Sequence, residues 1–542
     1  MIIRARSGLG PAACTILAVL SGSATAAPQS AAPIDWQPCA PLVEAADPAA
    51  ECAVVQMPWF HEAPGDLRIG IMVARIRGNG DPAQPRRQIW FLDGGPGDSG
   101  IASLKRVREV IADPELDYYT LDHRGVGGSA LLACPQQQAT DSEDGREITE
   151  QEWPACMASL RANRQDLDAL TTTQSAHDLG ALVNRLARPQ DQVVVFGASY
   201  GTYWANRYLQ LYPDQPDGVI LDGIVPVDWT FAEFDADLDL LAQRLMSRCA
   251  EDPACAAHLG PDPWVTTRQL PDRFDAGHCS DLQIDSRTVR LILGNMLMGG
   301  PEVWPYVAPM VHRLNQCRLR DLLAIGTLVE RLFEQGDAGQ EPASHSPVLQ
   351  RHVALSEMWP DPPPDPQELA SPGFPMTTEV SAAFARTFAD WPRYPREARL
   401  LTAAEYDGPM LLLHGELDPT IPPERLASTR SHFAGKHQVF VLIPDAGHVV
   451  VSDSDCAQSL YRAFLEDPHQ PLDTRCVGTD APTDLFAVPA GQDSAFGTDD
   501  LWGDHLSDFE IVLIGAAAAV LLGLVLLIRW LLNKRRRRQQ VT

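Results

Sequence analysis

Six short apolar runs recur along the chain, and helical stretches separate several of them. The runs cover residues 88–92, 118–121, 192–196, 218–221, 410–413 and 439–443. Because few polar residues interrupt them, they fit strands that are buried on both faces, as in a parallel sheet. Helical periodicity at 178–186 and 203–212 lies between the runs. This alternation predicts an α/β fold with a mostly parallel central sheet and helices on both faces.

Two segments before the first buried run predict an antiparallel strand pair. Residues 52–57 and 67–77 are short apolar stretches bounded by Pro- and Gly-containing turn signals. Much later, between residues 227 and 402, the strand rhythm stops and helical patches rich in Trp and Pro take over. We therefore predict a large, mainly helical cap insertion at 227–402, which divides the core into residues 27–226 and 403–477.

The first 26 residues have the layout of a secretory signal peptide. Arg4 and Arg6 precede an apolar centre, and Ala24-Thr25-Ala26 forms a small-residue cleavage site. We expect cleavage after Ala26, which would export the rest of the chain.

The other end of the chain predicts a membrane anchor. Residues 478–508 are polar and rich in Gly and Asp, as in a linker, and the apolar run 511–532 within 509–532 is long enough to cross a bilayer. The basic segment 533–542 follows, so the positive-inside rule places this tail in the cytoplasm. These features predict an exported, periplasmic domain tethered by a C-terminal helix. The alternative is a span that belongs to a sorting signal removed after export.

Export changes how the cysteines are interpreted, because an oxidising compartment allows thiols to pair. Removal of Cys14 with the signal leaves ten cysteines, and their grouping favours pairs of sequence neighbours. The expected pairs are Cys39–Cys52, Cys134–Cys156, Cys249–Cys255, Cys279–Cys317 and Cys456–Cys476. No Cys or His set has zinc-site spacing, so we predict neither a metal nor another cofactor.

The net charge of −28 argues against nucleic acid as a partner. Binding to phosphates requires a basic surface, and no basic stripe occurs before the last ten residues.

Ser199 is the predicted nucleophile. It lies in Gly197-Ala198-Ser199-Tyr200-Gly201, which matches the G-x-S-x-G pattern of a nucleophile elbow. The motif alone is weak, but an apolar strand runs straight into it and a helical stretch follows. A sharp turn of this kind exposes the serine hydroxyl and directs the helix N-terminus and the Tyr200 N–H at a forming oxyanion.

A serine hydroxyl needs a histidine to take its proton and a carboxylate to orient that histidine. Asp418 and His448 follow two late strands, so both are expected at the carboxyl edge of the sheet, beside Ser199. Competing candidates are Glu416 or Asp222 for the acid and His414 for the base. The second oxyanion donor is expected in the Gly-rich loop after residue 92, with Gly95 as first choice and Gly94 as second.

These motifs together resemble the proline iminopeptidase and tripeptidyl aminopeptidase branch of the α/β-hydrolases. The resemblance rests on residues 94–97, 122–129, 197–202, 414–419 and 447–448, and it spans residues 36–476. It implies an exopeptidase that removes one or a few residues from free peptide amino termini, with a cap after the sixth core strand. Members of the branch hold the substrate ammonium with cap carboxylates, and Glu357 is the best match in this cap. Asp122 and Arg124 are interpreted as structural supports.

The sequence therefore predicts a serine aminopeptidase acting on peptides with a free N-terminus through an acyl-enzyme. A carboxylesterase or lipase acting on small acyl esters would use the same three residues. A non-catalytic binding module on a hydrolase fold is the third possibility, which the intact set of Ser199, Asp418 and His448 disfavours.

Overall fold

The computed structural model describes residues 33–39, 46–142, 147–162, 167–280, 284–337, 344–369, 373–479, 485–487, 494–498 and 500–504. The chain divides into two units, Met1–Asp35 and Trp36–Thr542, and the description below concerns the second. The signal peptide predicted at 1–26, the span at 509–532 and the tail at 533–542 lie outside the described residues. Within the described ranges, no helix combines the length and the apolar character that a bilayer crossing requires.

One nine-stranded sheet organises the described chain, in the order β1-β2-β3-β5-β4-β6-β7-β8-β9. The first three strands and the β3–β5 pair are antiparallel, and the strands from β5 to β9 are parallel neighbours. The strands are β1 (Gln37–Pro38), β2 (Glu51–Pro58), β3 (Arg68–Ile76), β4 (Arg87–Leu92), β5 (Asp117–Leu121), β6 (Gln192–Ala198), β7 (Gly218–Asp222), β8 (Met410–Gly415) and β9 (Gln438–Ile443).

All six apolar runs found in the sequence are strands of the parallel part of this sheet, and the predicted antiparallel pair is β2 and β3. The two-residue strand β1 has no comparable apolar pattern and was not anticipated. Burial explains why apolar runs predicted these strands, because β5 and β7 are buried at every position and β4 at all but its first residue. Such strands admit little but apolar side chains.

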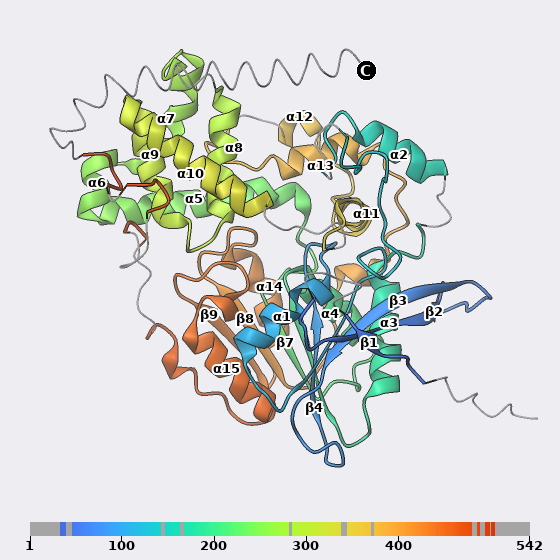
Figure 1. Cartoon of the computed structure of the whole chain (residues 1–542). Helices are drawn as coiled ribbons and strands as arrows, with labels where there is room; N and C mark the ends of the chain where they lie inside the picture. Colours follow the sequence, from blue (N-terminus) through green and yellow to red (C-terminus); the bar gives the residue numbers. More distant parts are fainter. Residues whose placement is uncertain are drawn as a thin grey trace, which may run out of the picture. The chain divides into compact units, whose positions relative to one another are not determined.

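Helices cover the sheet and complete the core. They are α1 (Gly100–Ile111), α3 (Thr172–Leu186), α4 (Tyr200–Leu211), α14 (Ala427–His432) and α15 (Asp455–Glu466). Helix α2 (Trp153–Ala162) lies beside the cap helices instead (Figure 1), where Trp153 packs against Trp391 and Arg161 pairs with Asp390. Helix α3 begins six residues before the predicted start, because the Thr171 hydroxyl caps it by accepting a hydrogen bond from the Gln174 N–H. One apolar cluster joins α1 and α15 to the sheet through Ile101, Leu460 and Val194.

The helical insertion lies between β7 and β8, as predicted, and its helices are grouped at one end of the sheet (Figure 1). They are α5 (Phe234–Glu251), α6 (Pro253–Leu259), α7 (Pro263–Asp275), α8 (Ser286–Met298), α9 (Val307–Gln316), α10 (Leu319–Asp337), α11 (Pro347–Glu357), α12 (Pro366–Leu369) and α13 (Val380–Phe388). Short 3₁₀ turns, such as Phe231–Glu233 and Ala398–Leu401, connect this insertion to the core.

Part of the predicted linker at 478–508 packs against this cap. Leu485, Phe496 and Leu501 are buried in the same apolar cluster as Val311 of α9. The Arg313 guanidinium also donates a hydrogen bond to the carbonyl oxygen of Leu501 at 3.0 Å. These described stretches therefore belong to the packed cap, a contact that the polar composition of the segment did not reveal.

The five disulfides join the pairs expected from the sequence: Cys39–Cys52, Cys134–Cys156, Cys249–Cys255, Cys279–Cys317 and Cys456–Cys476. Five disulfides in one chain indicate an extracytoplasmic location, since reducing compartments keep thiols unpaired.

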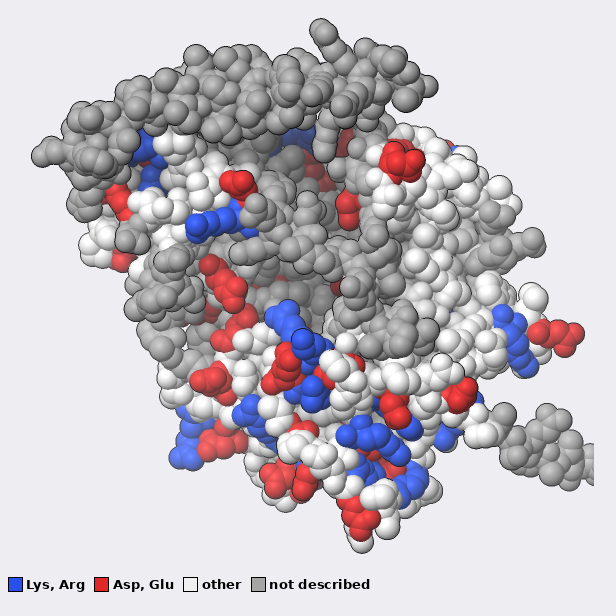
Figure 2. Space-filling model, viewed as in Figure 1, with Lys and Arg blue, Asp and Glu red and all other residues white. Residues whose placement is uncertain are grey.

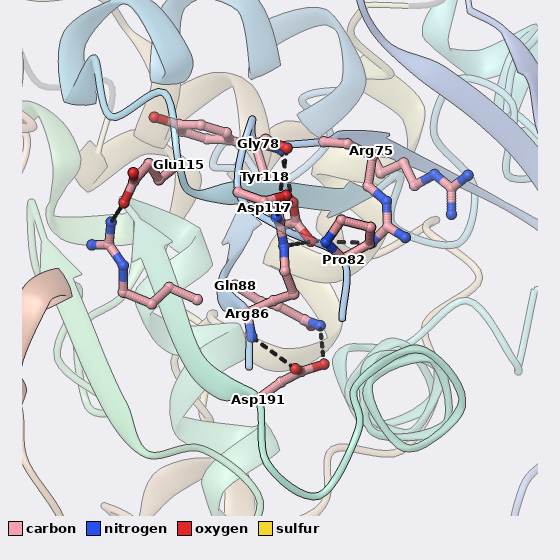
Figure 3. A network of polar contacts seen from close by, with 12 residues as sticks. Arg75, Gly78, Pro82, Arg86, Gln88, Glu115, Asp117, Tyr118 and Asp191 are labelled. Carbon is pink, nitrogen blue, oxygen red and sulfur yellow. Dashed lines mark hydrogen bonds and ion pairs between the residues drawn. The ribbon is translucent and has the colours of Figure 1, made fainter. Parts of the chain in front are cut away.

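A polar network holds the amino ends of β4, β5 and β6 together (Figure 3). The Arg86 guanidinium pairs with Asp117, and the Arg86 N–H donates to Asp191 at 2.9 Å. Gln88 donates to the second oxygen of Asp191 at 3.2 Å. Because these groups are buried and satisfy one another, we interpret the network as structural. The candidate site lies at the opposite, carboxyl ends of these strands, where Ser199 follows β6 and the Gly-rich loop follows β4.

Acidic and basic side chains are interspersed over the core on the face shown in Figure 2. No continuous basic surface is visible among the described residues of that face.

Candidate active site

Ser199 stands at the turn between β6 and α4, in the conformation that a nucleophile elbow requires. Its φ is 55° and its ψ is −127°, a backbone region that L-residues rarely adopt. The flanking glycines make the turn possible, because a Cβ on Gly197 would lie 2.4 Å from the Gly201 carbonyl oxygen. The Ser199 N–H donates to the carbonyl oxygen of Asp222 at 2.9 Å, which fixes the elbow to the end of β7.

The Gly-rich loop after β4 lies directly against the serine. A Cβ on Gly94 would be 2.8 Å from the Ser199 Cβ and 3.2 Å from its Oγ, so only glycine fits there. The Gly94 N–H already donates to Asp93 Oδ1 at 2.8 Å. This bond favours Gly95, whose φ is 104°, over Gly94 as the oxyanion donor of this loop.

Asp418 and His448 are brought together although they lie 30 residues apart. His448 Nδ1 is 2.6 Å from Asp418 Oδ2, and the carboxylate is fully buried. The other carboxylate oxygen accepts hydrogen bonds from the N–H groups of Thr420 at 2.8 Å and Ile421 at 2.9 Å. These backbone hydrogen bonds hold the Asp418 carboxylate in place independently of its contact with the imidazole.

Electrostatics favour an ionised acid beside a basic imidazole. Burial raises the pKa of Asp418, but the charge of His448 and the hydrogen bonds outweigh it and hold that pKa below its usual value. Burial likewise lowers the pKa of His448, but the charge and hydrogen bond of Asp418 raise it overall, with help from Asp222 and Asp453. An ionised carboxylate only accepts, so the proton of neutral His448 lies on Nδ1 and the lone pair on Nε2.

Ser199 and His448 line one cavity of about 280 Å³, whose walls also include Gly94, Gly95 and Phe196. His448 Nε2 is buried and has no hydrogen-bond partner among the described residues. The Ser199–His448 hydrogen bond is therefore not formed in this structure. A basic nitrogen without a partner, in the cavity of a strained serine, is suited to take a proton there.

A second cavity, of about 680 Å³, also has His448 in its wall, together with Glu302 at the cap and Pro419 in the loop of Asp418. His448 thus lines both cavities.

The competing base candidate, His414, has both ring nitrogens occupied. Its Nδ1 accepts from the Ile224 N–H at 3.1 Å, and its Nε2 donates to the Ile421 carbonyl oxygen at 2.8 Å. Burial lowers its pKa, which keeps the ring neutral. The competing acid Glu416 is paired with Arg248 at 3.0 Å instead of a histidine.

Asp222, the other competing acid, binds backbone groups near His448 and not its ring. Its carboxylate accepts from the N–H groups of Val450 at 2.9 Å and Val451 at 3.0 Å, and from the Tyr461 hydroxyl at 3.0 Å. Burial raises its pKa to about 6.

Glu357 ends helix α11 and is 1% exposed. Its carboxylate accepts from the Thr172 N–H at 3.1 Å, the Thr172 hydroxyl at 2.6 Å and the Tyr394 hydroxyl at 2.6 Å. The Thr172 hydroxyl is in turn 2.6 Å from the Tyr200 hydroxyl, one residue after the serine. Glu357 is not among the residues that line the Ser199 cavity. The described partners of its carboxylate are all neutral donors, while the Arg396 guanidinium donates to the Glu357 main-chain carbonyl oxygen at 3.3 Å. Burial raises the pKa of Glu357.

Asp122 and Arg124, interpreted from the sequence as structural supports, are both buried and form polar contacts. Asp122 accepts from the Ser99 hydroxyl at 2.7 Å, which holds the start of α1. Arg124 is fully buried and pairs with Asp178 of α3 at 2.6 Å.

Sequence reasoning missed Asp93. It lines the Ser199 cavity, and burial together with the charge of Asp98 raises its pKa to about 7. Its place just before the Gly-rich loop was the available signal. As for metals, no group of three or more His, Cys, Asp or Glu side chains in the described ranges is arranged to hold an ion.

Comparison with known proteins places this geometry in a family. Residues 89–255 match the family model described as alpha/beta hydrolase fold, and residues 377–476 match the model described as TAP-like protein. The tripeptidyl aminopeptidase of Streptomyces lividans is 28% identical over 238 residues, which are 40% of this chain and 43% of that protein. The chain thus spans less than half the length of that relative.

Two other relatives give the same picture. The serine protease Hip1 of Mycobacterium tuberculosis is 23% identical over 488 residues, covering 82% of this chain and 91% of that protein. The putative hydrolase YuaR of Escherichia coli is 25% identical over 316 residues, which are 53% of this chain and 62% of that protein. Together with the sheet order, the elbow and the insertion between β7 and β8, the matched models identify this chain as an α/β-hydrolase with a TAP-like domain.

Proposed function

We propose that the protein is a serine peptidase that releases one or a few residues from free peptide amino termini. Ser199 Oγ attacks the scissile carbonyl, His448 Nε2 takes the hydroxyl proton and later gives it to the leaving amine, and Asp418 holds the imidazole tautomer. Water then attacks the acyl-enzyme and frees the product. The N–H groups of Tyr200 and Gly95 are the proposed oxyanion donors.

One observation carries this proposal: the unpartnered Nε2 of His448 and the strained Ser199 line the same cavity, while Nδ1 is held by Asp418 at 2.6 Å. The preference for peptides has separate support. It rests on the match to the TAP-like model and on the similarity to the Streptomyces tripeptidyl aminopeptidase and the Mycobacterium serine protease.

Glu357 is the proposed ligand of the substrate ammonium. In favour of this role, it is a buried carboxylate for which no ion pair is formed with a described Arg or Lys, and a buried anion is stabilised by a cation. A hydrogen-bonded path through Thr172 and Tyr200 connects it to the elbow. We expect Glu357→Gln to raise KM for substrates with a free amine and to leave acetylated substrates unaffected. An equal effect on both classes would remove the role.

A substrate panel on the wild type and Ser199→Ala tests the function. We expect turnover of aminoacyl and tripeptidyl amides by the wild type, little turnover of the same peptides after acetylation, and loss of turnover in Ser199→Ala with an unchanged circular dichroism spectrum. Turnover that survives Ser199→Ala would refute the mechanism.

Esterase activity is the second candidate, favoured by the apolar part of the cavity wall, which includes Phe91, Val107 and Ile111. Faster turnover of short acyl esters than of any amine-bearing peptide would select it. A non-catalytic binding module would show no turnover on the whole panel.

We further propose that the domain is exported and tethered to a membrane through residues 509–532. Cell fractionation tests this: the full chain should sediment with membranes and be cleaved by protease added outside the cytoplasmic membrane. A version that ends at residue 504 should be released.

A further inference from the structure

Asp222 contacts both the nucleophile elbow and the loop after β9 that carries His448, called the histidine loop below. It is the last residue of β7, is fully buried, and lies opposite Ala198 of β6. Its carbonyl oxygen accepts the Ser199 N–H at 2.9 Å. The main chain of Asp222 therefore fixes the position of the Ser199 backbone relative to β7.

The side chain of Asp222 points to the other partner of the reaction. One carboxylate oxygen accepts the Val450 N–H at 2.9 Å, and the other accepts the Val451 N–H at 3.0 Å and the Tyr461 hydroxyl at 3.0 Å. Val450 and Val451 follow His448 by two and three residues. One residue thus binds the backbone on both sides of the proposed proton transfer.

The histidine loop needs such a clamp because its backbone is strained. Val449, directly after His448, has a φ of 63°. A β-branched side chain is disfavoured there, and such a conformation persists only where the surroundings fix it. The imidazole is also packed closely, since a Cβ on the neighbouring Gly223 would lie 3.0 Å from His448 Cε1.

We propose that Asp222 is a positioning residue that holds the His448 loop in its strained conformation and in register with Ser199. This inference rests on the proposed function. Asp222 does not touch the reacting atoms. It acts through the two N–H groups that it binds and through its charge, which faces His448.

The charge gives a readout that a purely structural role would not affect. The groups that face His448 are Asp418, Asp222 and Asp453, which raise its pKa, and the neutral His414 beyond Asp418. Loss of the Asp222 charge should therefore lower the pKa of His448. Because the reaction requires neutral His448, the acid limb of the kcat/KM profile should move to lower pH.

Asp222→Asn is the primary variant. The Val450 and Val451 N–H groups bind different carboxylate oxygens, and in the amide an NH2 donor replaces one of these oxygens, so one of the two N–H groups loses its acceptor in the native geometry. We expect kcat to fall by about tenfold to a hundredfold with little change in KM, as for a displaced catalytic group, and the acid limb to shift to lower pH. Labelling by a fluorophosphonate should slow in parallel.

Val449→Gly supplies the second test, because glycine adopts a φ of 63° without strain. If Asp222 holds the strained loop, Asp222→Asn/Val449→Gly should turn over faster than Asp222→Asn. Asp239→Asn is the matched control, because Asp239 in α5 of the cap is another buried carboxyl whose pKa is raised to about 6. It should leave kcat and the acid limb unchanged.

The outcomes distinguish a failure of the proposed Asp222 role from a failure of the proposed peptidase function. If Ser199→Ala loses labelling and turnover while Asp222→Asn matches the wild type in kcat and in its acid limb, only the inference is overturned. The same holds if Asp222→Asn changes KM alone, or if both it and its double variant fail to fold. If Ser199→Ala retains turnover, the proposed function itself fails.

Discussion

His448 Nδ1 lies 2.6 Å from Asp418 Oδ2, and this contact orients the other ring nitrogen toward the cavity of Ser199. Asp418→Asn keeps the shape but places an amide where the imidazole donates, which favours the wrong tautomer. We expect kcat to fall about 10,000-fold with KM nearly unchanged. Steady-state kinetics on a tripeptidyl amide measures this.

Glu416→Gln is the matched control for that change. Glu416 lies two residues away and is ion-paired with Arg248 near the surface. Exposed pairs of this kind contribute about 1 kcal/mol or less to stability, so kcat should stay close to the wild-type value. A larger loss of kcat in Glu416→Gln than in Asp418→Asn would assign the acid to Glu416.

His414→Phe should affect stability more than chemistry. The change leaves the Ile224 N–H and the Ile421 carbonyl oxygen without their buried partner, at a cost of about 1–3 kcal/mol per group. The free energy of unfolding in urea should fall accordingly, while the folded fraction keeps most of its turnover. Loss of turnover in a fully folded His414→Phe would contradict our assignment of the base.

The pH profile should show an acid limb with a midpoint above 6.5, the ordinary pKa of histidine. Asp418 raises the pKa of His448, so the imidazole is protonated and inactive as pH falls through this raised value. Above that pKa the base is neutral and kcat/KM reaches its plateau. The limb should move to lower pH in Asp418→Asn, because the carboxylate charge is lost; no movement would indicate that another group controls the limb.

The cap disulfide that closes the longer loop should stabilise the fold more, because loop-closure entropy grows with the logarithm of loop length. Cys279–Cys317 spans 38 residues, so its removal by paired Ala substitution should cost about 3–4 kcal/mol. Cys249–Cys255 spans 6 residues and should cost about 2 kcal/mol. Thermal unfolding of the two double variants compares them directly. Equal effects, or a larger effect for the short loop, would show that loop closure does not dominate.

The sequence alone determined the parallel sheet, the elbow and the insertion. Strands such as β7 are buried throughout, so burial leaves an apolar run that can be recognised without coordinates. The elbow is equally local, because Gly197, Ser199 and Gly201 satisfy one sharp turn and its close contacts. Strand ends then predicted that Asp418 and His448 share one edge of the sheet, and in the structure His448 Nδ1 lies 2.6 Å from Asp418 Oδ2.

Other features depended on contacts between residues far apart in the chain. The choice between Asp222, Glu416 and Asp418 was open in the sequence, since each follows or ends a strand. The structure places the Asp222 carboxylate on the Val450 and Val451 N–H groups, 228 and 229 residues away, and Asp418 on the imidazole. Likewise, Leu485, Phe496 and Leu501 lie in a polar stretch whose composition suggests a linker, yet they are buried against the cap. The local sequence pattern indicates which side chains avoid water. The packing of distant segments decides which partner a polar group, or an isolated apolar group, contacts.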